Sequence, residues 1–396
     1  MARSIEALVE PRLLVWGRRS AGLDIESAAR KVQVKRECLE RWERGESRPT
    51  LTQLRKLGRA YKRPIAVFYL PEPPEDFQAL RDFRRLPGAV SAVESPELRF
   101  EIRRAQSRRE LALELYELAA ESPPSLPLSV ALSDDPEDLA HATRGFLGIR
   151  YEDQVRWAAG YEAFNRWRAA LEDTGILVFQ TTEVEVSEVR GFSVYAERLP
   201  AIVVNVKDSV RGRLFTMLHE LTHILLHQSG VCNLHEETRA LSDEQRFEVF
   251  CNLAAGAAII PREYLLLEEP VAAKRGNVIW TDEELAYLAD RYGCSREVVL
   301  RRLLVCGRTT EAFYRAKREQ LLEEYEEAAR RAAARGKTGF APPHRVAVSS
   351  AGPLFVRLVL ESYHQEQITA SDVADFLDVR LKHLPKIESE VLRVAS

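Results

Sequence analysis

Residues 217–227, which read MLHELTHILLH, constrain the fold and chemistry of this chain more than any other segment. An α-helix places residues four apart on one face, so His219 and His223 can both reach a single metal ion. Glu220 lies one position further round the helix, where it can take a proton from a water on that metal. Because a His-Glu-x-x-His pattern also arises by chance, the rest of the sequence must decide whether this is a metal site.

A third ligand is needed, since a catalytic zinc ion usually has three protein ligands and keeps a fourth position for water. His227 continues the four-residue spacing. At a rise of about 1.5 Å per residue, however, its backbone lies about 12 Å from that of His219, too far for one ion to bind both. The metzincin arrangement needs a Gly turn before a third His, and no Gly lies between His223 and His227. We therefore expect His227 beside the site or at the helix end.

Glu248 is the strongest remaining candidate. It lies in the apolar sequence FEVFC, within a helix that we predict from residue 244 to residue 259. A carboxylate is costly to bury there without a partner, and a zinc ion would be that partner. Glu237 and Glu244 have polar neighbours and are weaker candidates. The sequence therefore predicts one Zn²⁺ per chain, with three ligands: His219, His223 and Glu248.

Length and composition bound the class of protein. A chain of 396 residues favours two or three domains, and 45% hydrophobic with 30% charged residues is typical of a soluble globular protein. No apolar run is long enough to cross a membrane and the first residues lack a signal core, so we expect a cytoplasmic protein without a membrane partner. The five cysteines have no metal-ligand or redox spacing and are expected to be buried thiols.

The first 65 residues are basic, with sixteen Lys or Arg against eight Asp or Glu, which suggests a polyanion partner such as nucleic acid. An apolar helix from about residue 13 ends at Gly22, and Asp24 can cap a second helix over residues 25–31. A third helix over residues 36–44 would end at Gly45, and a fourth is predicted over residues 51–61. Two short helices joined by a tight turn fit a DNA-binding helix-turn-helix.

Several residues carry a resemblance to the XRE family, of the lambda-repressor type, over residues 10–65: Gly22-Leu23, Ala28-Ala29, WERG at 42–45 and Pro49-Thr50. The resemblance implies that residues 35–44 enter the major groove. The residues expected to contact DNA are Lys35, Arg36, Glu37, Glu40, Arg41 and Arg44. Phosphates are expected to meet Arg18, Arg19, Arg44 and Arg48. The alternative is a helical module that binds protein.

The rest of the chain predicts a multidomain protein that is mostly α with a small β-sheet (α+β). Helices are predicted over residues 96–120, 135–146, 154–172, 281–289, 295–304 and 308–335, with a small helical unit at 352–390. Residues 64–74 form a strand or turn with a proline-rich exit, and three short strands at 176–179, 191–195 and 201–206 brace the His-Glu helix. An edge strand could hold an extended peptide. The domain boundaries that we expect are 8–65 for the helix-turn-helix, 66–95 for a linker, 96–308 for a zincin-like body, 309–337 for a charged helix and 351–396 for the C-terminal unit.

The sequences GFS at 191–193, AIVVN at 201–205 and RLFTMLHELTHILLH at 213–227 look like the ImmA/IrrE metallopeptidase family. So does EVFCNLAA from residue 248, with Ile260-Pro261 at its end. The resemblance implies that Glu248 is the third zinc ligand and Glu220 the general base. It also implies a substrate, a DNA-binding repressor of the XRE type. Thr222 stands where the family commonly has Gly.

Two functions are compatible with these features. The first is a DNA-binding zinc endopeptidase that regulates transcription by cleaving an XRE-type repressor in response to stress or mobile-element signals. The second is a non-proteolytic regulator or antitoxin that controls a neighbouring toxin, for example a PIN-type nuclease. The partners implied are DNA, a repressor or toxin, and a second copy of the chain in a homodimer. Candidates for oxyanion or supporting roles are Tyr195, His227, His235 and Tyr264.

Overall fold

A computed structural model describes residues 6–74, 81–82, 95–157, 160–227, 230–232, 243–274, 279–335 and 341–395. The chain divides into two compact units, one formed by Met1–Ala79 with Arg85–Arg104 and the other by Leu80–Arg84 with Ala105–Ser396. The described chain is mostly helical and contains one small mixed sheet, which confirms the predicted fold class. Within these ranges no helix is both long and apolar enough to cross a bilayer.

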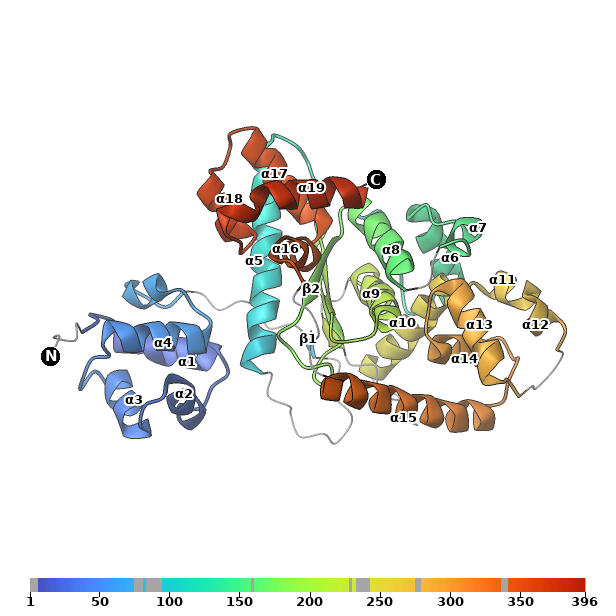
Figure 1. The fold of residues 1–396 in the computed structure, drawn as a ribbon, viewed down its shortest axis with the longest axis horizontal. Coiled ribbons are helices and arrows are strands. Elements are labelled where there is room, and N and C mark those ends of the chain that lie inside the picture. Colours follow the sequence, from blue (N-terminus) through green and yellow to red (C-terminus); the bar gives the residue numbers. More distant parts are fainter. Residues whose placement is uncertain are drawn as a thin grey trace. The chain divides into compact units, whose positions relative to one another are not determined.

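The first unit contains four short helices and a 3₁₀ turn, shown in blue in Figure 1: α1 (Pro11–Ser20), α2 (Ile25–Val32), α3 (Arg36–Glu43), α4 (Leu51–Tyr61) and η1 (Ile65–Tyr69). The predicted cap is present, because Asp24 accepts a hydrogen bond from the Ser27 N–H at the start of α2. Gly45 takes a positive φ of 74° directly after α3, the conformation expected of a residue that ends a helix. The strand or turn predicted from residue 64 is the 3₁₀ turn η1, which buries Phe68 against Tyr61.

The sheet of the second unit has five strands in the order β1-β5-β3-β4-β2: β1 (Arg81–Asp82), β2 (Leu177–Thr181), β3 (Gly191–Val194), β4 (Ala201–Asn205) and β5 (Gly230–Cys232). The strands β2, β3 and β4 are the three predicted ones. Their pairing is parallel between β2 and β4 and antiparallel between β3 and β4. The edges are β1 and β2, whereas β3 is paired on both sides with β4 and β5. All residues of β2, β3 and β4 are buried, as expected of a sheet covered on both faces.

Helices make up the rest of the second unit. Their bounds, after α5 (Pro96–Leu118), which begins in the first unit, are α6 (Pro136–Phe146), α7 (Tyr151–Gln154), α8 (Tyr161–Asp173), α9 (Val210–Leu225), α10 (Asp243–Ile259), α11 (Arg262–Leu267), α12 (Glu269–Ala272), α13 (Asp282–Tyr292), α14 (Arg296–Val305), α15 (Glu311–Arg335), α16 (Pro343–Ala351), α17 (Pro353–His364), α18 (Ala370–Phe376), η2 (Leu381–His383) and α19 (Leu384–Ala395). In Figure 1, α8, α9 and α10 lie on one side of the sheet and α16 on the other.

The helix α9 packs against β3 and β4, and α10 packs against both α9 and α6. A buried arginine fixes the end of α10: Arg302 of α14 donates to the Ile260 carbonyl and, through two further N–H groups, to the Glu137 carboxylate of α6. The two central helices are therefore held from several directions, which suits a pair that must present functional side chains at fixed positions.

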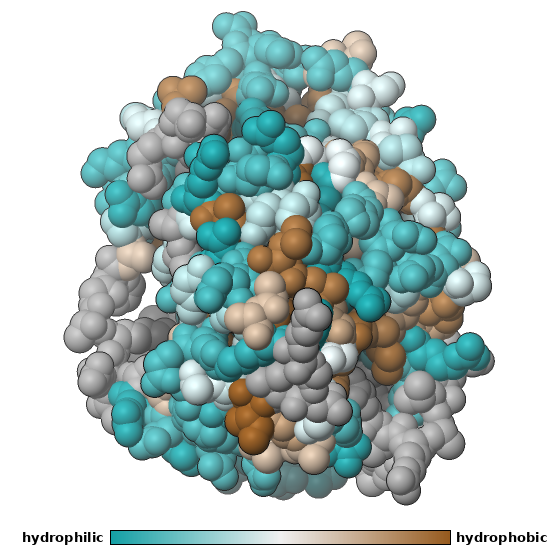
Figure 2. All heavy atoms as spheres, turned by 90° about the vertical axis from the view of Figure 1, so that its right-hand side faces the viewer, coloured by the Kyte–Doolittle hydropathy of each residue, from teal (hydrophilic) through white to brown (hydrophobic). Residues whose placement is uncertain are grey.

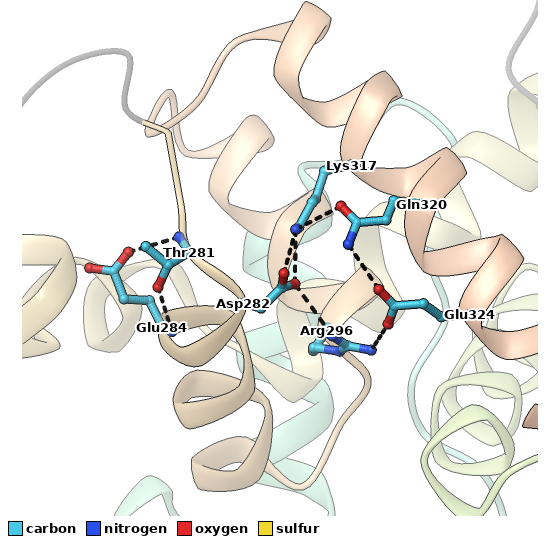
Figure 3. A network of polar contacts seen from close by, with 7 residues as sticks. All are labelled: Thr281, Asp282, Glu284, Arg296, Lys317, Gln320 and Glu324. Carbon is cyan, nitrogen blue, oxygen red and sulfur yellow. Dashed lines mark hydrogen bonds and ion pairs between the residues drawn. The ribbon is translucent and has the colours of Figure 1, made fainter.

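The charged helix α15 is attached through a polar network to the helices before it (Figure 3). Lys317 of α15 donates to Asp282 at the start of α13, at 2.8 Å and 2.9 Å from its two carboxylate oxygens. Arg296 at the start of α14 donates to Glu324 of α15 at 2.6 Å. Within α15, Gln320 bonds both Lys317 and Glu324. The charged surface of α15, which the sequence pattern predicts to be solvated, is thus partly used for packing against α13 and α14.

The C-terminal helices dock on the body. Phe355 of α17 contacts Phe179 of β2 edge-on, with ring centroids 6.1 Å apart. The Leu354 N–H donates to Glu172 of α8, and Arg168 of α8 donates to the Ser349 carbonyl of α16. Docking onto the body is what the apolar face of this unit predicts. The unit begins earlier than expected, because α16 starts at Pro343.

Some expectations were wrong in detail. The helix predicted over residues 154–172 begins later, as α8 at Tyr161, because Gly160 adopts a φ of 85° immediately before it, and the short helix α7 ends at Gln154. The sheet has two strands more than predicted, and one of them, β1, lies in the segment expected to be a linker. Of the cysteines whose surroundings are described, Cys251, Cys294 and Cys306 are buried free thiols as predicted, whereas Cys38 is half-buried.

Figure 2 shows the face formed by α11 to α14, where hydrophobic side chains gather in the middle of a polar surface. Large apolar side chains exposed on or next to these helices are Leu267, Ile279, Tyr287 and Val305. They lie on the surface, outside the core that positions α9 and α10.

Candidate metal centre

The helix α9 carries the His-Glu-x-x-His pattern and is buried along most of its length. Ser209 caps it by accepting from the Gly212 N–H, and every residue from Arg213 to Leu225 is buried. His219, Glu220 and His223 have no exposed surface. Three ionisable side chains on one buried helix are costly unless each has a partner, so the pattern has a definite chemical role here.

Glu248 of α10 meets both histidines. Its Oε2 lies 3.4 Å from His219 Nε2 and its Oε1 lies 3.2 Å from His223 Nε2. The two Nε2 atoms are 3.1 Å apart. These three residues are the group of His, Cys, Asp or Glu side chains that could hold a metal within the described ranges. The structure thus brings together the residues that the sequence singled out.

The spacing of these atoms fits a zinc ion. Zinc bonds of about 2.0–2.2 Å in a tetrahedron separate neighbouring ligand atoms by about 3.3–3.6 Å. The separations here, 3.1 Å, 3.2 Å and 3.4 Å, are close to that range. Two imidazole nitrogens and a carboxylate are also a ligand set that zinc accepts in peptidases. The residues present therefore fit the metal that the sequence predicts.

The charges at the centre favour a cation. Burial alone would raise the pKa of Glu248, but the two facing imidazoles outweigh it and hold the pKa well below its usual range. Burial likewise acts to lower the pKa of His219, but the Glu248 carboxylate outweighs it and the pKa lies above its usual value. An ionised carboxylate that draws positive charge onto neighbouring nitrogens attracts a metal ion for the same reason that it attracts a proton.

Glu220 lies on the same helix and is not one of the grouped metal-ligand candidates. Burial raises its pKa above the usual carboxyl value, and the charges of His223 and His219 and the nearby hydroxyl of Ser193 only partly oppose this. Among the described residues, neither carboxylate oxygen has a hydrogen-bond partner of normal geometry. A buried carboxyl group that is not used in packing is free to exchange a proton with a molecule that enters the site.

Three neighbours of the centre were not identified from the sequence. Asn252 raises the pKa of His219 by hydrogen bonding, and it follows Glu248 by one helical turn, a spacing that could have revealed it. Phe215, one turn before His219, contacts its ring with centroids 6.3 Å apart. Ser193 comes from β3 and could not have been found, because no spacing links it to α9.

The four candidates for an oxyanion or supporting role lie in different places. His227 directly follows α9 with a positive φ of 56°, and its ring stacks on Tyr195 with centroids 4.9 Å apart. His227 is outside the metal-holding group, as the helix rise predicts. Tyr264 of α11 stacks on Tyr151 with centroids 3.9 Å apart. His235 lies outside the described residues.

The predicted DNA-contacting residues lie on and beside α3. Lys35, Arg36, Glu37, Arg41 and Arg44 are exposed. Glu40 is half-buried and accepts from Arg36 at 2.7 Å, which offsets the negative charge that would otherwise face phosphates. Arg18, expected at a phosphate, has its guanidinium engaged inside the unit, where it donates to both Glu43 oxygens at 2.7 Å and 2.8 Å.

Comparisons with known families agree with this geometry. Residues 171–304 match the peptidase family model described as an IrrE N-terminal-like domain, and residues 16–68 match a helix-turn-helix model. The chain contains an IrrE N-terminal-like domain and a helix-turn-helix domain. No curated protein and no solved structure matches the chain.

The match to the IrrE N-terminal-like domain covers β2, β3, β4, α9 and α10, and therefore includes every residue of the candidate metal centre. The segments that resembled the ImmA/IrrE family in the sequence, between about residues 190 and 261, fall inside it. The helix-turn-helix match covers α2 and α3 with their connecting turn. The two resemblances seen in the sequence are confirmed at the level of domains.

Proposed function

We propose that this chain is a DNA-binding, zinc-dependent endopeptidase that regulates transcription by cleaving an XRE-type repressor. The observation that carries the proposal is the convergence of His219, His223 and Glu248 beside the fully buried Glu220, in a domain that matches a peptidase family. Because both its target and its operator are intracellular in such a role, we place the chain in the cytoplasm.

In the mechanism, His219, His223 and Glu248 would hold the metal ion. Zinc, when bound, supplies Lewis acidity towards a water molecule and towards the carbonyl of the scissile peptide bond. Glu220 takes the proton of that water and later passes it to the leaving amine. Burial prepares Glu220 for both steps, since a raised pKa makes the carboxylate a better base and the carboxyl group a better proton carrier than an exposed glutamate at neutral pH.

A cavity of about 480 Å³ beside the centre supports a peptide substrate. Phe215 and Asn252 line it, each one helical turn from a metal-ligand candidate. The opposite wall comes from α15, where Leu321, Leu322 and Tyr325 lie beside the charged side chains of Arg318 and Glu324. The arginines at its rim already have carboxylate partners, as Arg190 has in Asp208 at 3.2 Å. A wall whose charges are paired and whose other side chains are apolar suits a large apolar side chain of a substrate.

The helix-turn-helix domain supports a role at DNA. Exposed basic side chains on α3 can contact base edges or phosphates, and a peptidase tethered to an operator would meet a repressor bound nearby at high effective concentration. The helix-turn-helix domain would thus bring the peptidase domain to its substrate.

The test is incubation of the zinc-loaded full chain with the XRE-type repressor or toxin encoded next to it, in parallel with Glu220→Gln. Glutamine preserves shape but cannot act as a base, so we expect cleavage by the wild type and a loss of about 10²–10⁴-fold in the variant. Cleavage at equal rates by both proteins would refute the role of Glu220. Binding without cleavage, with unchanged operator control by Glu220→Gln, would instead support a non-proteolytic regulator or antitoxin.

A further inference from the structure

A second cavity, of about 420 Å³, lies where the C-terminal helices meet the IrrE N-terminal-like domain. Its walls come from α8, β2 and the start of α9 on one side, and from α16, α17 and α19 on the other. Five arginines and three carboxylates line it. This volume lies within the range of small-molecule sites, and the excess of arginine makes the cavity positively charged.

Arg213 of α9 is the most unusual of these arginines. It is 6% exposed, and none of the described carboxylates forms an ion pair with it. Its hydrogen bonds go to neutral groups, Gln180 Oε1 at 3.0 Å and the Tyr161 hydroxyl at 3.5 Å, and its Nε is buried without a partner. Buried arginines nearly always have a counter-charge, so this cation lacks the anion that its surroundings call for.

The aromatic rings beneath Arg213 do not remove that need. Its guanidinium lies 5.5 Å from the Tyr161 ring and 5.4 Å from the Phe164 ring, which gives favourable cation–π contacts. These contacts stabilise the cation weakly compared with the cost of removing a charge from water. Arg213 also lines the cavity, so an anion bound there would lie beside its guanidinium.

A second buried arginine faces the same space. Arg168 of α8 pairs with Glu172 at 3.2 Å and donates to the carbonyls of Val178 and Ser349. Burial lowers the pKa of Arg168, and the charge of Arg213 lowers it further, which is the mark of two cations in mutual repulsion. The Glu172 carboxylate offsets one of the two arginine charges, and the other has no counter-charge from this residue.

The remaining charges do not supply the missing anion. Arg345 of α16 pairs with Glu390 of α19 at 3.6 Å, and Arg357 of α17 is half-buried at the cavity wall. Asp173 is exposed and is the one lining carboxylate outside these pairs. The fifth arginine, Arg166, pairs with Glu162 of α8 at 3.9 Å. The charges of Arg213 and Arg357 exceed that of Asp173, so the cavity carries a net positive charge.

We propose that this cavity binds a small phosphate-bearing ligand, with Arg213 and Arg357 as its charged contacts and Arg168 behind them. Phosphate oxygens accept the two parallel N–H bonds that a guanidinium offers, and they bring the negative charge that Arg213 lacks. The Tyr161 ring, which is largely exposed at the edge, gives a planar group such as a base a surface to stack on. The site lies outside the metal centre.

The ligand would touch both the catalytic helix and the C-terminal helices. Arg213 lies six residues before His219 on α9, and Arg357 comes from the C-terminal part of the chain. A ligand that bridges them adds contacts between these two parts that the free protein does not have. Its binding is independent of whether the metal centre cleaves a peptide.

The test is isothermal titration calorimetry of the full-length protein with inorganic phosphate, AMP and ATP, each with excess magnesium so that the ligand does not remove zinc. We expect at least one to bind with a Kd below about 1 mM. Arg213→Gln and Arg357→Gln should each weaken binding about tenfold or more. The matched control is Arg315→Gln on the exposed side of α15, which should bind like the wild type.

The outcomes separate the alternatives. Equal affinity in all four proteins would place the phosphate elsewhere, for example on the basic helix-turn-helix domain, and would overturn the proposal. The proposal would also be overturned if none of the three ligands binds at concentrations up to about 10 mM. If ATP or AMP binds more than tenfold tighter than phosphate, the nucleotide base would be assigned to the side of the cavity where Tyr161 lies. If Arg213→Gln fails to fold, Arg357→Gln decides, because its side chain is only half-buried.

Discussion

Gly191 determines how closely β3 can approach the metal-bearing helix. A Cβ placed on it would lie 2.4 Å from Thr216 Cγ2 of α9 and 2.8 Å from the Val203 carbonyl oxygen of β4. Carbon atoms in good contact are about 3.5–4.0 Å apart, so a methyl group here is too close by about 1 Å. The Glu220 Cγ would be 3.5 Å away. Replacing Gly191 by Ala must therefore push β3 and α9 apart.

The expected loss has two parts. Overpacking a buried contact of this kind costs about 1–3 kcal/mol in the free energy of unfolding. Displacing Glu220 by about 1 Å from its position would lower the rate of cleavage about 10²-fold. Urea denaturation measures the first and the repressor cleavage assay the second. Gly145→Ala in α6 is the matched control: a Cβ there meets nothing within 4 Å, so this variant should gain about 0.4–1 kcal/mol.

A second substitution tests the cause. Thr216→Ser removes the Cγ2 atom that Gly191→Ala collides with, so the double variant should regain part of the lost stability, while the contact with the Val203 carbonyl remains. If Gly191→Ala unfolds at the same urea concentration as the wild type and cleaves as fast, the close approach of β3 to α9 does not position Glu220.

Three further predictions concern other parts of the chain. Glu248→Ala should lose bound zinc in metal analysis, whereas His227→Ala should keep one ion; undiminished zinc in Glu248→Ala would exclude it as a ligand. Hydrogen bonding from Lys317 lowers the pKa of Asp282, so its contribution to stability is present above about pH 4 and is lost as the pH falls through the depressed value; the melting temperatures of wild type and Lys317→Gln should therefore converge in acid and differ at neutral pH. Arg41→Ala, at an exposed position on α3, should weaken operator binding, as measured by fluorescence anisotropy at several salt concentrations. The slope of log affinity against log salt concentration should become shallower by about one; an unchanged slope would show that Arg41 does not contact a phosphate.

The candidate metal centre could be predicted because its geometry is encoded locally. The four-residue spacing of His219 and His223 requires only a helix, and the apolar neighbours of Glu248 already indicated a carboxylate with a buried partner. The cap of α2 could be predicted for the same reason, since Asp24 bonds to a backbone group only three residues away.

Features that depend on distant segments could not be predicted. The strands β1 and β5 have two and three residues, too few to show an alternating pattern, and they exist through pairing with segments far along the chain. The missing counter-charge of Arg213 is likewise invisible in sequence, because many arginines have carboxylates nearby along the chain and only the folded arrangement shows which of them form ion pairs.

The metal-ligand candidates come from two helices that are separate in sequence, and this has a thermodynamic consequence. An ion held between α9 and α10 would bind the folded chain and not the unfolded one, so its free concentration enters the folding equilibrium. At a free zinc concentration 100 times the dissociation constant, the folded state gains about 2.7 kcal/mol. The amount of folded protein would then follow the supply of metal, and the cell's zinc level would set how long each copy of the chain survives.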